Sequence, residues 1–255
     1  MNAFTSFFKK ELLELSRNGK LLLLSILFVL FGILNAATAK LTPQIFKMFA
    51  DTLESSGLAI GEVEVTALQA WEQFFKNLST LMIIVIIVFS NIFAKEYNSG
   101  TLIPLIAKGL SRRKIAAAKS LTVQLAWAVG YWVYFAVTDV YAMIYWDNSI
   151  AKHLASAAGF AYLFGAFLLS VMLVFAAISD STISVLLGTG GVYLVLTLCG
   201  MIPKCKEFLP TKLADGMAIL NGIAQPQDDF KAMFIALFAT VLLTFSCIFL
   251  RKQKI

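Results

Sequence analysis

The amino-acid sequence predicts an all-α membrane protein with six transmembrane helices, and three observations support this prediction. Of the 255 residues, 59% are hydrophobic and 14% are charged, whereas a soluble domain has about 45–50% apolar and about 25% charged residues. Six uncharged stretches are each long enough to cross a hydrocarbon core about 30 Å thick. Most of the positive charge lies on one side of these stretches. We therefore expect a single membrane domain, residues 1–255.

The six predicted spans are separated by short polar segments, which leaves no room for a soluble domain. The first is preceded by about 20 residues of amphipathic sequence and lacks a small-residue cleavage site, so we interpret it as a span rather than a cleaved signal. The spans are Leu21–Ala39, Leu78–Ala94, Ser120–Thr138, Leu154–Ser179, Ser181–Pro203 and Ala232–Leu250.

The charge distribution predicts the orientation of the chain. With the N-terminus inside, the inner segments hold 13 basic and 4 acidic residues, and the outer segments hold 8 basic and 10 acidic residues. Lys and Arg are retained on the cytoplasmic side of short loops. Both termini are therefore expected on the cytoplasmic side of the membrane. The net charge of +6 is explained by this asymmetry and does not call for a nucleic-acid partner.

The N-terminal segment, residues 1–20, predicts an amphipathic helix before the first span. Phe4, Phe8, Leu12 and Leu15 fall on one face at 100° per residue, and the basic residues Lys9, Lys10 and Arg17 fall on the other. Such a helix lies in the membrane interface with its apolar face toward the lipid. Glu11 falls on the apolar arc, where it either reaches back to water or pairs with Arg112, Arg113 or Lys114.

Two longer outer segments are expected. Residues 40–76 are predicted to form one or two short amphipathic helices, with Trp71, Phe74 and Phe75 anchoring the second span as an aromatic belt. Residues 203–229 are apolar in the middle but interrupted by Pro and Gly, which favours a re-entrant or interface-lying helix pair.

Short polar features outside these segments carry structural expectations. Asp180, in the inner turn between spans four and five, is predicted to cap span five. Cys199 and Cys205 are close enough in sequence for a disulfide, which the sequence leaves open. No CxxC and no metal-ligand spacing occurs, and the lone His153 lies at a membrane edge. We expect neither a metal nor a catalytic site.

The inner loop at residues 95–114 holds the most informative motif. It contains Glu96, Tyr97, Asn98, Ser99, Gly100 and Thr101, and then Ser111-Arg112-Arg113-Lys114. Gly100 permits a sharp turn, and Ser111 can cap span three. A positive-inside anchor would explain the basic residues, but it would not explain the Glu-x-x-x-Gly-Thr-Leu order before them.

That order resembles the ABC-2 family of ATP-driven transporter permeases. Glu96, Gly100 and Thr101 match a family element at the end of span two; Ser111, Arg112, Ile115, Ala118 and Lys119 match a second element at the start of span three. The segment around Phe7–Leu12 resembles the family's interfacial elbow helix. One departure is Lys108-Gly109-Leu110, where many members have Pro.

The resemblance implies a dimer of permeases, either two copies of this chain or this chain with a homologous one, bound to two copies of an ABC ATPase subunit. A short coupling helix in this loop would dock on the ATPase and carry its motion into the spans, through Glu96, Tyr97, Asn98, Ser99, Gly100, Thr101, Arg112 and Arg113. The resemblance also implies a location in the bacterial inner membrane. The chain lacks a Gly-x-x-x-x-Gly-Lys-(Ser/Thr) sequence. ATP and Mg²⁺ would therefore be bound by the partner and not by this chain.

The sequence says less about the role of span five and about the transported substance. Gly188, Gly190 and Gly191 permit close helix contact, so span five is expected at the dimer seam. The spans are lined by Phe, Leu, Val and Ala, which suits a hydrophobic or amphipathic peptide or a lipid-like cargo.

Other classes of function remain as alternatives. A non-transporting sensor or immunity component would share the same topology. An intramembrane enzyme would need clustered catalytic groups, and a secondary transporter would need ionisable groups within the spans; both are disfavoured by the sequence.

Overall fold

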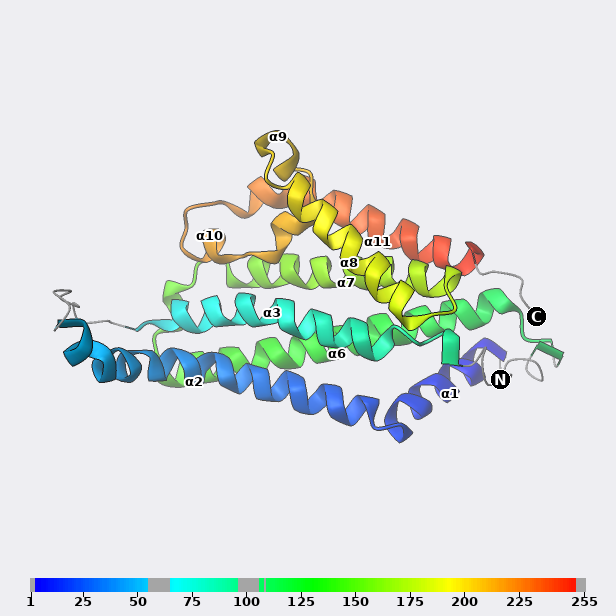
Figure 1. Ribbon diagram of the computed structural model, residues 1–255, viewed down its shortest axis with the longest axis horizontal. Coiled ribbons are helices and arrows are strands. Elements are labelled where there is room, and N and C mark those ends of the chain that lie inside the picture. The colour runs from blue at the N-terminus through cyan, green and yellow to red at the C-terminus, as the bar shows by residue number, and fades with distance from the viewer. Residues whose placement is uncertain (1–2, 55–64, 96–105, 108, 251–255) are drawn as a thin grey trace.

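The computed structural model describes residues 3–54, 65–95, 106–107 and 109–250, and it forms an elongated helical bundle (Figure 1). Six of its helices are long and apolar enough to cross a membrane, which confirms the predicted fold class. In chain order the elements are α1 (Ala3–Arg17), α2 (Lys20–Glu54), α3 (Ala67–Phe89), α6 (Arg112–Tyr145), η1 (Asn148–Ile150), α7 (Leu154–Ile178), α8 (Thr182–Cys199), α9 (Pro203–Lys206), η2 (Pro210–Ala214), α10 (Met217–Leu220), η3 (Pro226–Asp229) and α11 (Phe230–Leu250).

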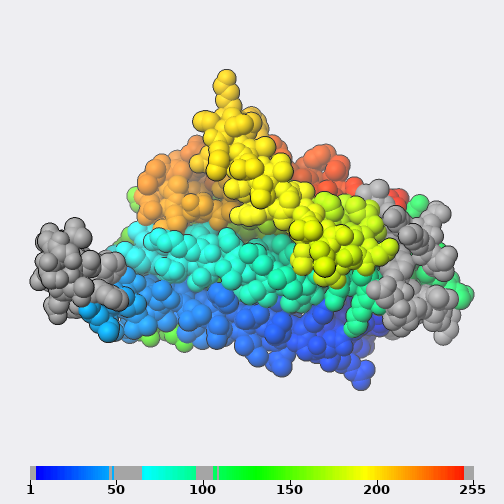
Figure 2. Space-filling view, viewed as in Figure 1, coloured from blue at the N-terminus to red at the C-terminus, as the bar shows by residue number. Residues whose placement is uncertain are grey.

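Helix α7 forms the centre of the bundle. It is apolar on every side, and 72% of its most apolar 18-residue stretch is buried. Helices α11, α8, α6 and α3 and the outer short helices pack around it. A helix that is hydrophobic all round is typical of such a central position. By contrast, α8 is buried over only 11% of its window, and it crosses the surface of the bundle while α9 projects from it (Figure 2).

Both chain ends lie at one end of the bundle (Figure 1). We call this the charged end; it contains α1, the beginning of α6 and the end of α11. The Arg113 guanidinium lies over the Phe249 ring, 4.8 Å from its centroid, which joins the beginning of α6 to the end of α11. An even number of spans with both ends together is what the charge pattern predicted.

The first outer segment differs from the prediction. Where short separate amphipathic helices were predicted, α2 continues to Glu54 and α3 begins at Ala67; residues 55–64 lie outside the described part of the chain. Thr66 and Gln69 form a capping box at the start of α3. Span two was predicted to begin after the charged residues Glu72 and Lys76. In the structure these two residues lie within α3 and pair with each other across one turn at 2.6 Å.

The predicted aromatic belt is also wrong for Trp71, Phe74 and Phe75. Trp71 and Phe74 are fully buried, and Phe74 stacks on Tyr134 of α6 with ring centroids 4.4 Å apart. The Tyr134 hydroxyl donates to the Phe74 carbonyl at 2.8 Å. These rings join α3 to α6, because buried Tyr and Trp need hydrogen-bond partners that a neighbouring helix supplies.

The second outer segment, residues 203–229, forms four short helical turns rather than a helix pair. Its residues Leu213, Ile219 and Leu220 are buried on α7 and its neighbours. Lys212 forms a 2.7 Å ion pair with buried Asp229, which joins the middle of the segment to its end. The buried residues hold the middle of the segment on the bundle, whereas α9 is exposed.

Two smaller expectations have clear outcomes. The N-cap of α8 is Ser181 and not Asp180, and it makes no side-chain capping bond. Cys199 and Cys205 are not joined by a disulfide.

Close packing of α7 against α6 leads to a first prediction. A Cβ added at Gly165 would overlap the buried Trp127 indole, and that indole is held by its N–H bond to the Tyr162 carbonyl at 3.1 Å. Gly165→Ala should therefore destabilise the protein by about 1–3 kcal/mol, measured by thermal unfolding in detergent.

The matched control is Gly159→Ala on the same helix, where an added Cβ meets no atom within 4 Å. It should leave stability unchanged or slightly raised, since Ala is the better helix former. Equal melting temperatures for the two variants would contradict the close contact at Gly165.

Candidate functional site

At the charged end, α1 lies against the first turns of α6. Phe7 of α1 is buried with Leu110, Ile115 and Ala118, and Phe4, Phe8 and Ile106 pack around them. Ser111 begins α6 by accepting a hydrogen bond from the Lys114 N–H at 3.4 Å, which confirms the predicted cap. The apolar face of α1 thus packs on the protein at Phe7, where the sequence predicted contact with lipid.

A buried ion pair lies at the centre of this contact. Glu11 Oε2 is 2.8 Å from Lys119 Nζ, and the two side chains are 6% and 3% exposed. Lys10 Nζ approaches the other Glu11 oxygen at 3.1 Å. The buried stripe of α1 runs through Phe7, Glu11 and Leu15, one residue per turn, so the carboxylate is part of the packed face.

Both sequence-based expectations for Glu11 are wrong. The carboxylate does not reach water, since it is buried, and its partner from α6 is Lys119 rather than Arg112, Arg113 or Lys114. The physical reason is the rotation of α6. Lys119 follows buried Ile115 by four residues and shares its face, whereas Arg113 and Lys114 are exposed.

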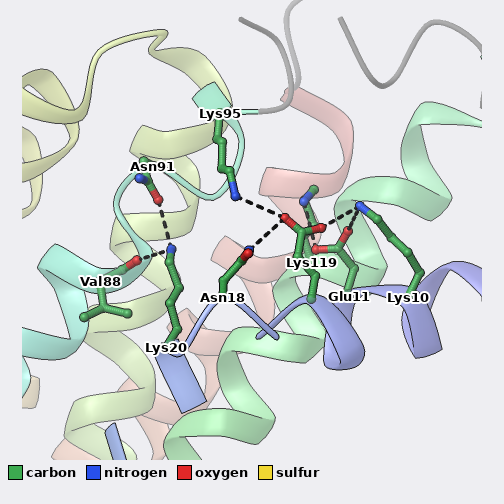
Figure 3. A network of polar contacts seen from close by, with 9 residues as sticks. Lys10, Glu11, Asn18, Lys20, Val88, Asn91, Lys95 and Lys119 are labelled. Atoms are coloured by element: carbon green, nitrogen blue, oxygen red, sulfur yellow. Dashed lines mark hydrogen bonds and ion pairs between the residues drawn. The ribbon is translucent and has the colours of Figure 1, made fainter. Parts of the chain in front are cut away.

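A second carboxylate extends the network toward the loop at residues 95–114 (Figure 3). Glu14 pairs with Lys10 at 2.8 Å and with Lys95 at 3.3 Å, and Asn18 donates to it at 3.3 Å. Partial burial raises the pKa of the Glu14 carboxyl, but the hydrogen bonds from Lys10 and Lys95 outweigh burial and lower that pKa to about 2. Glu14 is therefore ionised at any physiological pH.

The same network reaches α2 and α3. Lys20, at the start of α2, donates to the Val88 carbonyl at 2.7 Å and to Asn91 Oδ1 at 3.1 Å. These bonds fix the turn that follows α3, which ends at Phe89 and not at the predicted Ala94.

Helix α1 contacts both ends of the loop at residues 95–114. Lys95 at one end pairs with Glu14, and Ile106 and Leu110 at the other belong to the cluster around Phe7. The loop residues predicted to contact an ATPase, Glu96, Tyr97, Asn98, Ser99, Gly100 and Thr101, lie outside the described residues. Arg112 is half-buried and Arg113 is exposed. Leu12 is half-buried on α1.

The three glycines of span five do not share one environment. A Cβ at Gly188 would come 2.5 Å from the Phe175 ring of α7, whereas a Cβ at Gly190 or Gly191 would meet no atom within 4 Å. Gly188 thus serves packing within the chain. Gly190 and Gly191 are exposed and leave room for another helix.

An apolar cavity of about 370 Å³ opens between α3, α7 and α8. We call it the lateral cavity. Its wall includes one hydroxyl group each from Ser79, Thr189 and Tyr193, and the remaining lining is apolar: Leu78, Met82, Ile83, Ile86, Ile87, Phe164, Leu168, Leu186, Gly190 and Ala214. Over the described residues, no cluster of three or more His, Cys, Asp or Glu side chains is present.

Comparison with known families decides the class of the protein. The family model described as ABC-2 family transporter protein matches residues 5–231. The chain belongs to this family. The match begins within α1 and extends into α11, so it includes the ion pair, the loop and the lateral cavity. No curated protein and no solved structure matches the chain.

One functional contact of this permease was missed by sequence reasoning. Lys119 was noted only as the last residue of a motif, and its role as the partner of Glu11 was not inferred. A signal was present, because Glu11 and Lys119 are each a lone charge on an otherwise apolar helix face near the same membrane surface. Such charges are costly to bury unless they pair.

This geometry leads to a second prediction. Lys119→Met or Glu11→Gln alone removes one member of this buried ion pair and should cost about 3–5 kcal/mol. The double variant Glu11→Leu/Lys119→Met should recover most of this loss, since apolar replacement of a buried pair is often near neutral. Unfolding of the purified permease in detergent measures all three.

The matched control is the Glu72–Lys76 pair, whose side chains are 43% and 61% exposed. The same substitutions there should cost under about 1 kcal/mol. If the Glu11→Leu/Lys119→Met variant lost as much stability as the two single variants together, the pair would not be coupled.

Proposed function

We propose that this permease is the membrane subunit of an exporter that moves a hydrophobic or amphipathic substrate, a peptide or a lipid-like molecule, with ATP hydrolysed by a separate ATPase subunit. The family match over residues 5–231 carries the proposal. The lateral cavity supports the choice of substrate, because its lining is almost wholly apolar and lies between spanning helices.

The working assembly in this proposal contains two permease chains, identical or homologous, and two ATPase subunits. Helix α8 forms the seam through the open side of Gly190 and Gly191, where small residues allow backbones to approach. Support comes from the exposure of α8, with Leu187 71% and Leu194 57% exposed. Membrane lipid covers the remaining apolar surface.

The ATPase binds at the charged end, which faces the cytoplasm in this proposal, and ATP and Mg²⁺ are held by that partner. The loop at residues 95–114 receives the motion of the ATPase. In this proposal Glu96 lies at the base of a short coupling helix that begins near Asn98, and Arg112 and Arg113 lie beside it. Support comes from α1, which contacts described residues on both sides of the loop and joins them to α6 through the Glu11–Lys119 pair. Movement of the loop would therefore be transmitted to α3 and α6, the two spans that it connects.

Coupling gives the third prediction. Glu96→Gln and Gly100→Val should leave membrane insertion and ATPase binding intact but reduce substrate-stimulated ATP hydrolysis, because the first removes a charge at the base of the contact and the second blocks a turn. The measurement is ATP hydrolysis by the complex of permease and ATPase in lipid vesicles, with Glu207→Gln on the outer segment as the control.

If substrate-stimulated ATP hydrolysis were normal in both variants, the loop would serve only as a positively charged anchor on the cytoplasmic side. Failure of any ATPase to copurify with the wild-type permease would instead favour a non-transporting sensor or immunity component.

Orientation gives the fourth prediction. In a variant with Cys199, Cys205 and Cys247 replaced, a single cysteine at exposed Ser149 should react with an impermeant thiol reagent added to intact cells. A single cysteine at exposed Asp180 should react only after the cells are opened, because the basic side of short loops stays in the cytoplasm. The reverse labelling pattern would invert the topology and place the ATPase at the other end.

A further inference from the structure

A small polar cavity lies where α1, the beginning of α2, the end of α3 and α6 meet (Figure 3). Its volume is about 40 Å³, slightly more than the roughly 30 Å³ that one water molecule takes up in the liquid. Its charged lining consists of three lysines and two glutamates: Lys20, Lys95, Lys119, Glu11 and Glu14. We call it the lysine cavity.

The charges around this cavity are not balanced at Lys20. Glu11 is bonded to Lys119, and Glu14 is bonded to Lys10 and Lys95. Lys20 instead donates to two neutral oxygens, the Val88 carbonyl and Asn91 Oδ1, and no carboxylate of the described residues forms an ion pair with it. An ammonium group has three donors, so one N–H of Lys20 remains for a further acceptor.

An anion is the ligand that this arrangement favours. A half-buried cation is costly to leave unpaired, and the Phe89 ring, whose centroid lies 5.9 Å from Lys20 Nζ, supplies no hydrogen-bond acceptor. Lysine is an established binder of phosphate as a point charge. Asn18 and Asn91, which also line the cavity, offer amide donors for the remaining oxygens.

The exposed apolar residues beside the cavity place it at the expected membrane boundary. Directly after Lys20, the apolar side chains of Leu21, Leu22 and Leu23 are 41%, 65% and 48% exposed, as expected for the first turn of a helix that meets lipid. Lys95 on the other side of the cavity is 53% exposed. Because Glu14 is also held by Lys10, Lys95 can turn to a second anion without leaving that carboxylate unpaired.

We propose that the lysine cavity binds one phosphate oxyanion, with Lys20 and Lys95 as its charged contacts. The phosphate is either the diester of an anionic lipid headgroup or free inorganic phosphate; the chemistry of recognition is shared. Bound there, it would join α1, α2 and the turn after α3, so its binding should stabilise the folded chain.

The test uses the full-length permease in a phosphate-free maltoside detergent. Thermal unfolding is followed while one of three additives is titrated: inorganic phosphate, short-chain phosphatidylglycerol, or potassium chloride at matched ionic strength. Phosphate or the lipid should raise the melting temperature of the wild type beyond the chloride control. In Lys20→Gln, the concentration of phosphate or lipid that gives half of this rise should increase about tenfold. This is the loss of affinity expected for one charge-assisted hydrogen bond.

Arg17→Gln is the matched control, because it removes one exposed positive charge from the same end of the bundle without altering the cavity lining. It should leave the titration unchanged, which separates a specific site from general attraction of anions to a basic surface. If Lys20→Gln does not fold, Lys95→Gln provides the same comparison at a more exposed position.

The additives distinguish the two sources of phosphate. Stabilisation by both inorganic phosphate and phosphatidylglycerol supports a site open to free phosphate, and stabilisation by the lipid alone supports a headgroup site. Absence of stabilisation by either, or equal weakening in Arg17→Gln and Lys20→Gln, overturns the proposal.

Discussion

Within a bilayer, a helix gains little by exchanging lipid tails for the apolar surface of another helix. Association must come from close packing and from hydrogen bonds that cross between helices, and this permease contains both. Asn77 of α3 donates to Asn35 of α2 at 2.8 Å, and Asn35 donates to Thr138 of α6 at 2.9 Å. Gly165 provides the space that Trp127 fills. These contacts decide which faces of the helices meet, and the arrangement of the site follows from them.

The charged end illustrates the same constraint with ionised groups. Glu11 and Lys119 are buried together, although a buried ion pair adds little stability compared with well-packed apolar side chains. The pair restricts how α1 docks on α6, because a shift of register would break the 2.8 Å contact between the two buried side chains. With Glu14 and Lys95 fastening the other side of the loop, α1 acts as a brace between the loop and the spans.

Helices α7 and α8 show how differently two apolar sequences are used. Both lack charged residues, yet 72% of the most apolar stretch of α7 is buried and only 11% of the corresponding stretch of α8 is buried. The lateral cavity opens where α8 crosses α3 and α7. A helix with so much exposed apolar surface is suited to lipid or to another subunit, and the proposed seam uses this surface.

The number of spans, the meeting of both chain ends at one end of the bundle, and the family could all be predicted from the sequence. The number of spans follows from the length of each apolar stretch, since a helix that rises 1.5 Å per residue must cross a membrane core about 30 Å thick. The family follows from motifs of consecutive residues, which do not depend on tertiary packing. The sequence did not determine that Glu11 pairs with Lys119, that Trp71 and Phe74 are buried, or that Gly188 packs on Phe175. Each of these depends on how far one helix is rotated and shifted against its neighbour, and only the packed tertiary structure fixes that rotation.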